Sequence, residues 1–379
     1  MSWEAMKLGD VLPFKYGRNL PESKRTQTGE YDVVTSAGVA GSHCEALTTV
    51  PSVVVGRKGT IGKLTYCGAP VWPTDTAFFV EERDGVNLRF AYYLLSTLPF
   101  QSMNNDSAVP GLNRRDAEDL IVRIPSLQEQ NSIADVLGAL DDKIAANIRV
   151  KETCTELIKT IGSIPISNVP ASELAVQIKK QISAGKLQDL DVRHYSIPAF
   201  DLGYASIESG AEIKSGKNLI EAPCVLVSKL NPRTPRIWNI PTVDSEETTV
   251  CSTEFIAWQG TKVPQAALYA ALLQGSFSEQ LQERASGTSN SHQRVRPQDM
   301  QEATIPDVRK LDQETLKLLE ALNLQAADLI KENQVLAATR DELLPLLMNR
   351  KITVVEAEEA VGDVGVVKQK QQEEGDSDV

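Results

Sequence analysis

The chain has 379 residues, of which 41% are hydrophobic and 5% aromatic. This length predicts two or three domains, each able to bury its own core. No run of about 18 apolar residues is present, so a membrane span is not expected, and the first residues do not have the pattern of a signal peptide. Five cysteines, without Cys-x-x-Cys spacing, indicate reduced thiols in a cytoplasmic protein and disfavour a metal site.

The net charge of −12 is concentrated at the C-terminus. Residues 352–379 hold eight acids and two lysines, a net −6, and this polar segment is typical of a disordered acidic tail. The rest of the chain is only mildly acidic, so the total does not exclude a polyanionic partner. Local clusters of cations therefore matter more than the sum.

Residues 1–125 have the pattern of a globular domain that is rich in short strands. Runs of β-branched or aromatic residues, bounded by Gly, Pro or Asp, predict strands at 31–36, 52–55, 61–66 and 76–82. Residues 90–96 predict a short buried helix. Residues 107–124 combine a turn containing Gly and Pro with a strand-like end.

The stretch 126–162 predicts a long amphipathic helix that begins after Pro125. Its apolar residues recur at steps of three and four, and most residues between them are charged or polar, which is typical of one helix of a coiled coil. The apolar seam is too narrow for a fully buried helix, so we expect a partner helix. A second helix of this kind is predicted at 307–351.

The two predicted helices are copies of one another. A shift of 182 residues places LGALDDKIAANI (137–148) on LEALNLQAADLI (319–330) with five identities, and residues 163–306 repeat the order of 1–125. The expected seam residues are Leu137, Leu140, Ile144, Lys151 and Ile158 in the first helix and Leu319, Leu322, Leu329, Asn333, Leu336 and Leu343 in the second. The sequence thus predicts an internal duplication of a globular domain and a helix.

Polar residues interrupt both seams near the middle of the helices. They are Asn147 and Lys151 in the first helix and Asn333 and Arg340 in the second. Such residues specify register and orientation at a cost in stability, although a merely hydrated centre would show the same pattern. We expect Lys151 to lie close to Asn333.

The run IPSLQEQNSIADVLGALDDKI, from Ile124, resembles the sequence that leads into the spacer helix of specificity subunits of type I restriction-modification systems. LLPLLMNRKITV (343–354) resembles the end of the second spacer helix in that family. The resemblance covers about residues 6–355 and is weakest in the second globular domain. One departure is IPDVRKLDQET, which lacks the Glu-Gln pair found at Glu129 and Gln130.

The resemblance implies an α+β fold in which two target-recognition domains, 1–125 and 163–306, are separated by helices that pair as an antiparallel coiled coil with a pseudo-twofold internal repeat. Each domain would read one half of a bipartite site in double-stranded DNA. A helix of roughly 36 residues is about 54 Å long, or about 16 base pairs at about 3.4 Å each. The helices would therefore set the spacing between the half-sites.

The resemblance also implies what the chain does not do itself. It would be non-catalytic and would bind no cofactor or metal. Two methyltransferase (M) subunits would use S-adenosylmethionine to methylate adenine, and translocating restriction (R) subunits would join them. The specificity subunit would position both.

Candidate DNA contacts in the first domain are cations and an amide close to glycines, which let a backbone approach a ligand. They are Arg57, Lys58, Lys63, Asn113, Arg114 and Arg115. The segment GRKGTIGK (56–63) is not a Walker A loop, because its Gly-Lys lies one residue too far along and Leu64 replaces Ser or Thr. A solvated turn is the alternative for this segment, and Arg115 could instead pair with Asp116 or Glu118.

Candidates in the second domain form two groups. A stretch with few acids contains Lys214, Lys217, Lys229, Arg233 and Arg236, and a polar loop contains Asn290, His292, Gln293, Arg294 and Arg296. Asn, Gln and Arg are the side chains that pair with adenine and guanine edges. A flexible surface loop is the alternative for 289–296.

Two other classes of function remain for comparison. A methyltransferase needs an Asn-Pro-Pro-aromatic loop, and the nearest match, Asn231-Pro232-Arg233, lacks the second proline and the aromatic residue. The sequence therefore disfavours an enzyme. A coiled-coil scaffold that binds only protein is the alternative to the DNA-reading subunit, and the acidic net charge suits it.

Overall fold

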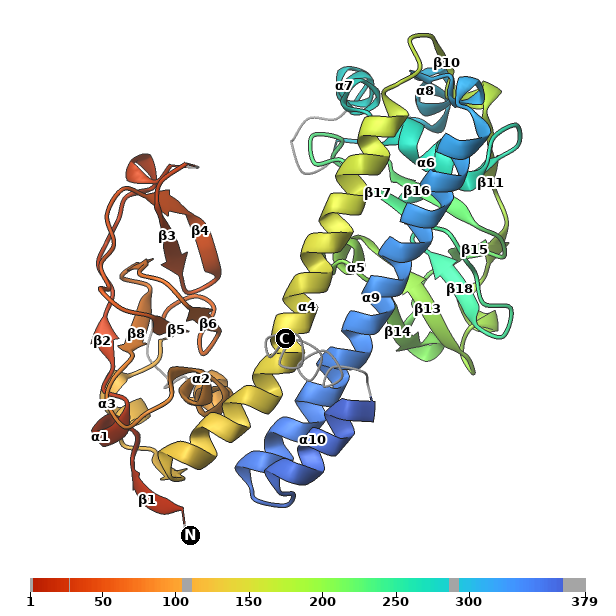
Figure 1. Ribbon diagram of the computed structural model, residues 1–379. Helices are drawn as coiled ribbons and strands as arrows, with labels where there is room; N and C mark the ends of the chain where they lie inside the picture. The colour runs from red at the N-terminus through yellow and green to blue at the C-terminus, as the bar shows by residue number, and fades with distance from the viewer. Residues whose placement is uncertain (1–2, 27, 104–110, 286–292, 364–379) are drawn as a thin grey trace, which may run out of the picture. The chain divides into compact units, whose positions relative to one another are not determined.

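The computed structural model describes residues 3–26, 28–103, 111–285 and 293–363 (Figure 1). The chain divides into two compact units. Unit 1 contains Met1–Ile144 and Val335–Val379, and unit 2 contains Ala145–Gln334. Both boundaries fall inside long helices, so each unit holds one globular part and a portion of each helix. No helix in the described part of the chain is long and apolar enough to cross a membrane.

The globular part of unit 1 is built on two sheets. The four-stranded sheet has the order β2 (Lys15–Tyr16), β8 (Ala77–Glu81), β5 (Ser52–Gly56), β6 (Leu64–Cys67), and the three-stranded sheet has the order β4 (Gly38–His43), β3 (Tyr31–Thr35), β7 (Trp72–Pro73). All pairs are antiparallel except β3 with β7. The four predicted strands are confirmed as β3, β5, β6 and β8, with small shifts at their ends.

Strand β5 is buried on both faces because a core lies on each side of it. Val53 and Val55 pack in the larger core with helix α2 (Leu88–Ser96), whereas Val54 packs with Val34 in a smaller core. Alternate residues of a strand point to opposite faces of its sheet. This explains why β5 is a continuous valine run rather than an apolar and polar alternation.

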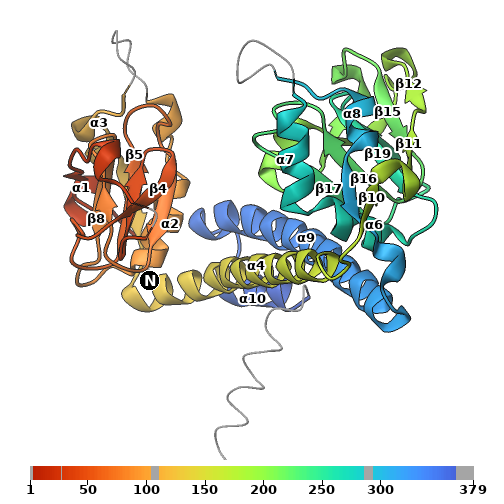
Figure 2. The same cartoon turned by 90° about the horizontal axis from the view of Figure 1, so that it is seen from above.

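The globular part of unit 2 repeats this plan. Its four-stranded sheet has the order β11 (Ala175–Ile178), β19 (Phe255–Gly260), β16 (Cys224–Ser228), β17 (Ile237–Ile240), and β19, β16 and β17 lie beside one another in Figure 2. Val225 and Val227 pack with helix α6 (Gln265–Leu272), and Leu226 packs in a separate core. Strand β16 therefore corresponds to β5, and α6 corresponds to α2.

The second sheet of unit 2 is larger than its counterpart. Its order is β12 (Gln181–Ile182), β15 (Lys217–Ile220), β18 (Thr248–Cys251), β13 (Asp191–Tyr195), β14 (Ser206–Ser209). Strands β13 and β18 pair in parallel, as β3 and β7 do, and β13 forms a hairpin with β14 as β3 does with β4. Strands β12 and β15 are therefore additions to a shared three-stranded core.

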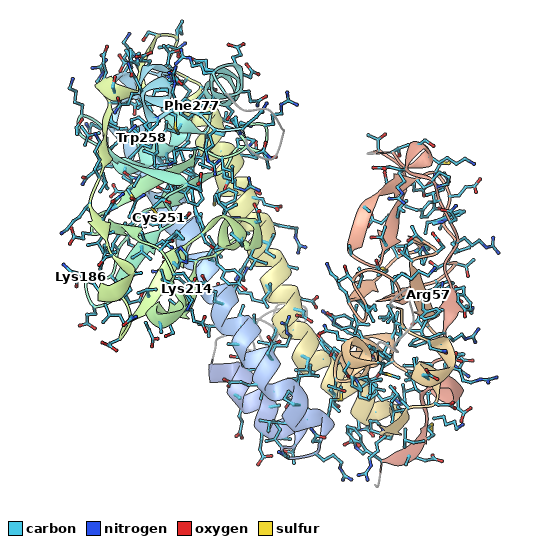
Figure 3. All side chains as sticks on the ribbon, turned by 180° about the vertical axis from the view of Figure 1, so that it is seen from behind. Arg57, Lys186, Lys214, Cys251, Trp258 and Phe277 are labelled. Atoms are coloured by element: carbon cyan, nitrogen blue, oxygen red, sulfur yellow. The ribbon has the colours of Figure 1, made fainter. Side chains whose placement is uncertain are left out.

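Short two-stranded sheets link the globular parts to the long helices. They pair β1 (Glu4–Lys7) with β9 (Ile121–Ile124) and β10 (Asn168–Pro170) with β20 (Thr304–Pro306). The remaining α-helices are α1 (Leu8–Val11), α3 (Arg114–Glu118), α5 (Ile197–Leu202), α7 (Gly275–Glu283), α8 (Pro297–Glu302) and α10 (Val354–Asp363). Trp258 of β19 and Phe277 of α7 are fully buried in the second globular part (Figure 3).

The long helices, α4 (Leu127–Gly162) and α9 (Gln313–Met348), pair within each unit. In unit 1 Arg340 Nη1 lies 2.6 Å from Asp141 Oδ1. In unit 2 Asn147 Nδ2 donates to Asn333 Oδ1 at 2.9 Å, and Cys154 Sγ lies 3.8 Å from Gln325 Oε1. In unit 2 the partners descend along α9 as they ascend along α4, so the two helical portions run antiparallel there. Every expected seam residue is buried or half-buried.

Two expectations about the long helices need correction. Helix α4 is buried over more than its narrow apolar seam. Ala134 and Val136 are also buried, and Gly138 lies against Arg89. Helix α9 begins at Gln313 rather than at 307, since Asp312 Oδ1 accepts the Thr315 N–H at 2.8 Å and caps it.

The acidic tail is also different from expectation. Residues 354–363 form α10, whose Ala357 and Val361 are buried in the core of unit 1, so predicted disorder is wrong for this part of 352–379. The rest of the tail, 364–379, lies outside the described residues.

Asn333 accepts a hydrogen bond from Asn147, which precedes Lys151, the residue expected close to Asn333, by four residues on α4. Asn147 is only 3% exposed and also donates to Glu332 Oε2 at 2.9 Å. Lys151 lies one helical turn further along α4 and lines a cavity of about 410 Å³ with Ala326 and Ile330. A buried amide needs a hydrogen-bonding partner, which explains why the asparagines face one another.

Candidate nucleic-acid interface

Several sequence-predicted cations of unit 1 gather where β5 ends. The Arg57 carbonyl accepts the Leu112 N–H at 2.9 Å, and Lys58 forms an isolated antiparallel bridge with Gly111. On the other side, Arg57 and Lys58 both donate their backbone N–H to the Thr76 carbonyl. We call Arg57, Lys58, Gly111, Leu112, Asn113 and Arg114 the first bridge site. It joins the end of the central strand to the segment that leads into α3.

Aromatic rings support the arginines of the first bridge site. The Arg57 guanidinium carbon lies 5.1 Å from the centre of the Tyr16 ring and 5.4 Å from that of Phe78, and Arg114 lies 5.8 Å from the same Tyr16 ring. An arginine over an aromatic face gains electrostatic attraction without losing its charge. The two rings therefore hold the guanidinium group of the half-buried Arg57 in a defined place beside β5 (Figure 3).

The other candidates of unit 1 take structural or peripheral positions. The Asn113 side chain caps α3 by accepting the Arg115 N–H at 2.9 Å. Arg114, rather than the suspected Arg115, pairs with Glu118, at 2.9 Å. Arg115 is exposed, and Lys63 donates to the Ala37 carbonyl away from the bridge.

The same backbone arrangement occurs at the end of β16 in unit 2. The Lys229 carbonyl accepts the Val295 N–H at 3.0 Å, Leu230 forms an isolated antiparallel bridge with Arg294, and the Asn231 N–H donates to the Gln293 carbonyl at 2.9 Å. The Lys229 N–H donates to the Glu254 carbonyl at 2.8 Å. We call Lys229, Leu230, Gln293, Arg294, Val295 and Arg296 the second bridge site.

Carboxylates hold both arginines of the second bridge site. Arg294 Nε and Nη2 lie 3.2 and 3.1 Å from the two oxygens of Glu254, and Arg296 binds Asp299 in the same way at 2.9 and 3.1 Å. These hydrogen bonds raise the pKa of both guanidinium groups and lower the pKa of Asp299. Both arginines nevertheless remain exposed to solvent.

The other candidates of unit 2 are dispersed. Arg236 forms a two-bond pair with Asp201 at 2.8 and 2.9 Å and its side chain is only 13% exposed, which indicates a structural role. Lys214 and Lys217 flank the start of β15 in the larger sheet and donate to the Ala211 and Ser215 carbonyls. Arg233 is exposed on the turn after β16. Asn290 and His292 lie outside the described residues.

Sequence reasoning missed Tyr16, Glu254 and Asp299 as parts of these sites. Tyr16 lies on β2, far from Arg57 in sequence, and Glu254 precedes β19. A residue-by-residue alignment of the two halves would have identified Glu254, because it is equivalent to Thr76 of the first half. All five cysteines are free thiols, of which only Cys44 is exposed, and among the described residues no cluster of His, Cys, Asp or Glu could hold a metal ion.

The fold and these sites define an α+β protein with two similar globular parts, each carrying a cationic strand end. Residues 1–153 match the family model of the type I restriction modification DNA specificity domain. The specificity subunit of the type I restriction enzyme EcoprrI from Escherichia coli is 23% identical over 155 residues, which cover 39% of this chain and 39% of that protein.

One solved structure extends the likeness in fold. The S subunit of a type I restriction-modification system from M. genitalium has a TM-score of 0.59 at 15% identity, covering 92% of this chain and 96% of that one. The HsdS subunit from Thermoanaerobacter tengcongensis has a TM-score of 0.32 at 12% identity, with the same coverage. The family-model match and the EcoprrI relative confirm the resemblance to type I specificity subunits, and residues 1–153 are the part that matches the specificity domain of this family.

Proposed function

We propose that this chain is the DNA-recognition subunit of a type I restriction-modification complex, in which each globular part reads one half of a bipartite DNA site. The observation that carries the proposal is the pair of bridge sites. In both, the carbonyl of the residue after the central strand accepts an N–H from the facing segment and an isolated bridge follows, yet the side chains differ. Two readers of different half-sites need a common frame and distinct side chains.

The long helices would separate the two readers. We propose that α4 and α9 form one antiparallel coiled coil whose length sets the number of unread base pairs, and whose outer faces bind two methyltransferase subunits. The pairing of Asn147 with Asn333 and of Asp141 with Arg340 supports one fixed register. On this proposal, the methyltransferase subunits hold S-adenosylmethionine and methylate adenine, restriction subunits join them, and this chain contributes no catalytic group.

Mapping of methylated adenines in DNA treated with the purified complex tests the proposal. We expect one bipartite sequence with a constant spacer. Methylation without sequence preference would contradict it and would favour the coiled-coil scaffold that binds only protein.

Deletion of one heptad from each long helix tests the role of the helices. Seven residues correspond to about 10 Å, so the spacer should shorten by about three base pairs at about 3.4 Å each. An unchanged spacer in a folded variant would refute the role of helix length.

A further inference from the structure

The two bridge sites differ in the residue whose carbonyl accepts the first N–H after the central strand. In unit 2 the residue whose carbonyl accepts the Lys229 N–H is Glu254, and in unit 1 the residue whose carbonyl accepts the Arg57 N–H is Thr76. The Thr76 hydroxyl accepts the Ser36 N–H at 3.2 Å and is committed to the loop. The Glu254 carboxylate instead binds Arg294 through two hydrogen bonds. A carboxylate thus pairs with the arginine of the isolated bridge in unit 2, at the position where unit 1 has the Thr76 hydroxyl.

Glu254 is well placed to control Arg294. Its N–H donates to Ser252 Oγ at 3.2 Å and its carbonyl is held by Lys229, so the backbone on both sides is fixed. Its side chain is 28% exposed, compared with 51% for Arg294. A carboxylate that engages Nε and Nη2 fixes the plane of the guanidinium group, because the five donors of arginine form a rigid fork. Glu254 does not use the donors of Nη1 or the second hydrogen of Nη2, and the Arg294 side chain is 51% exposed.

We propose that Glu254 is a specificity-determining residue of the second globular part, which orients Arg294 toward a base edge and keeps it from phosphates of unrelated DNA. The inference rests on the proposed function. A base edge with two acceptors, that of guanine, fits the remaining donors of Arg294. A free arginine would bind any phosphate. A fixed carboxylate beside the arginine repels a phosphate, because both groups are negatively charged.

The test uses the complete complex with Glu254→Gln. The probes are a duplex carrying the methylated site mapped for the unchanged complex and a duplex of equal composition with both half-sites scrambled. We expect tighter binding of the scrambled duplex and a ratio of the two affinities that falls by about tenfold, within the range of about 1–3 kcal/mol for one bidentate base contact. The salt dependence on the scrambled duplex should steepen by about 0.9 in log–log slope, as expected for one added phosphate contact.

Glu221→Gln is the matched control, because it removes the same charge and releases Lys180, which Glu221 binds at 2.6 and 2.7 Å elsewhere in the same half. It should leave the affinity ratio unchanged. Glu254→Asp keeps the charge but shortens the side chain, so it should weaken binding of the mapped site without tightening binding of the scrambled duplex. This variant also serves if Glu254→Gln does not fold.

Arg294→Ala separates failure of this inference from failure of the proposed function. If Arg294→Ala weakens binding of the mapped site but Glu254→Gln leaves the affinity ratio unchanged, the role of Glu254 is wrong and the proposed site stands. If neither Arg294→Ala nor Arg57→Ala affects binding, the bridge sites do not read DNA. In the Arg294→Ala background, Glu254→Gln should lose its effect on the ratio; a persisting effect would also overturn the inference.

Discussion

In both bridge sites one residue of the isolated bridge is a cation, but the cation belongs to the central-strand side in unit 1 and to the facing segment in unit 2. In unit 1 the cation of the isolated bridge is Lys58, opposite Gly111; in unit 2 it is Arg294, opposite Leu230. The N–H and the carbonyl of Arg57 and of Lys229 make equivalent backbone hydrogen bonds. The next N–H differs, because Lys58 donates to the Thr76 carbonyl and Leu230 donates to Ser228 Oγ. The comparison shows that duplication preserved the frame while the side chains diverged.

The helices show a similar divergence where they contact the globular parts. Asp141 of α4 and Asn323 of α9 are related by the shift of 182 residues. Asp141 accepts hydrogen bonds from Tyr93 and Arg340, whereas Asn323 accepts one from Asn239 at 2.7 Å. One position therefore anchors each globular part to its helix, through a tyrosine hydroxyl and a carboxylate in unit 1 and through two amides in unit 2.

The largest expected effect tests whether the two halves are equally well packed. Leu137 and Leu319 are equivalent, have no exposed surface and belong to different cores. Leu137→Ala and Leu319→Ala should each lower the free energy of unfolding by about 2–5 kcal/mol, measured by urea unfolding. The 46% exposed Leu318 is the control, since its replacement by Ala should change stability by less than about 0.5 kcal/mol. A small effect at only one core would show that the halves differ in packing.

Replacement of the two anchors should separate charged from neutral contacts. Asp141→Ala leaves Tyr93 without its partner and removes one of the two carboxylates of Arg340, so we expect a loss of about 1–3 kcal/mol. Asn323→Ala should cost about 1 kcal/mol. The measurement is urea unfolding, with Tyr93→Phe to isolate the hydroxyl. Equal losses at both anchors would argue against a distinct charged link in unit 1.

The strand ends should contribute unequally to DNA binding. Arg57→Ala should weaken binding by the complex by about 1–3 kcal/mol if Arg57 contacts a base, while Lys229→Ala should mainly reduce the salt slope, by about 1, if it contacts a phosphate. Lys186→Ala, which removes the same charge from an exposed turn of unit 2, is the control. Unchanged methylation of the mapped site in both variants would show that the strand ends do not read DNA.

Local patterns predicted much of the fold and many residues of the bridge sites, but not the partners of those residues. The valine run at 52–55 and the periodic stretch at 126–162 specify β5 and α4 through their own residues. Helix α10 was missed because its acids suggested a solvated tail, although Ala357 and Val361 lie four residues apart on one face. The contact between Arg294 and Glu254 joins segments 40 residues apart, and such pairing follows from sheet geometry that no local pattern contains.

The smallest expected effect is a difference in acid sensitivity. The paired arginine lowers the pKa of Asp307 and of Asp201 in unit 2, while Lys7 does the same for Asp119 in unit 1. A carboxyl group whose pKa is lowered by folding stabilises the protein above its ordinary value of 3.8 and loses that contribution as pH falls through the lowered value. As pH falls below 3.8, the free energy of unfolding should therefore fall less in Asp307→Asn than in the unchanged chain.

The Asp307 side chain is 9% exposed and that of Asp119 is 52% exposed, so Asp119→Asn should have a smaller effect because solvent screens its pair. A larger effect of Asp119→Asn would show that acid sensitivity resides in unit 1.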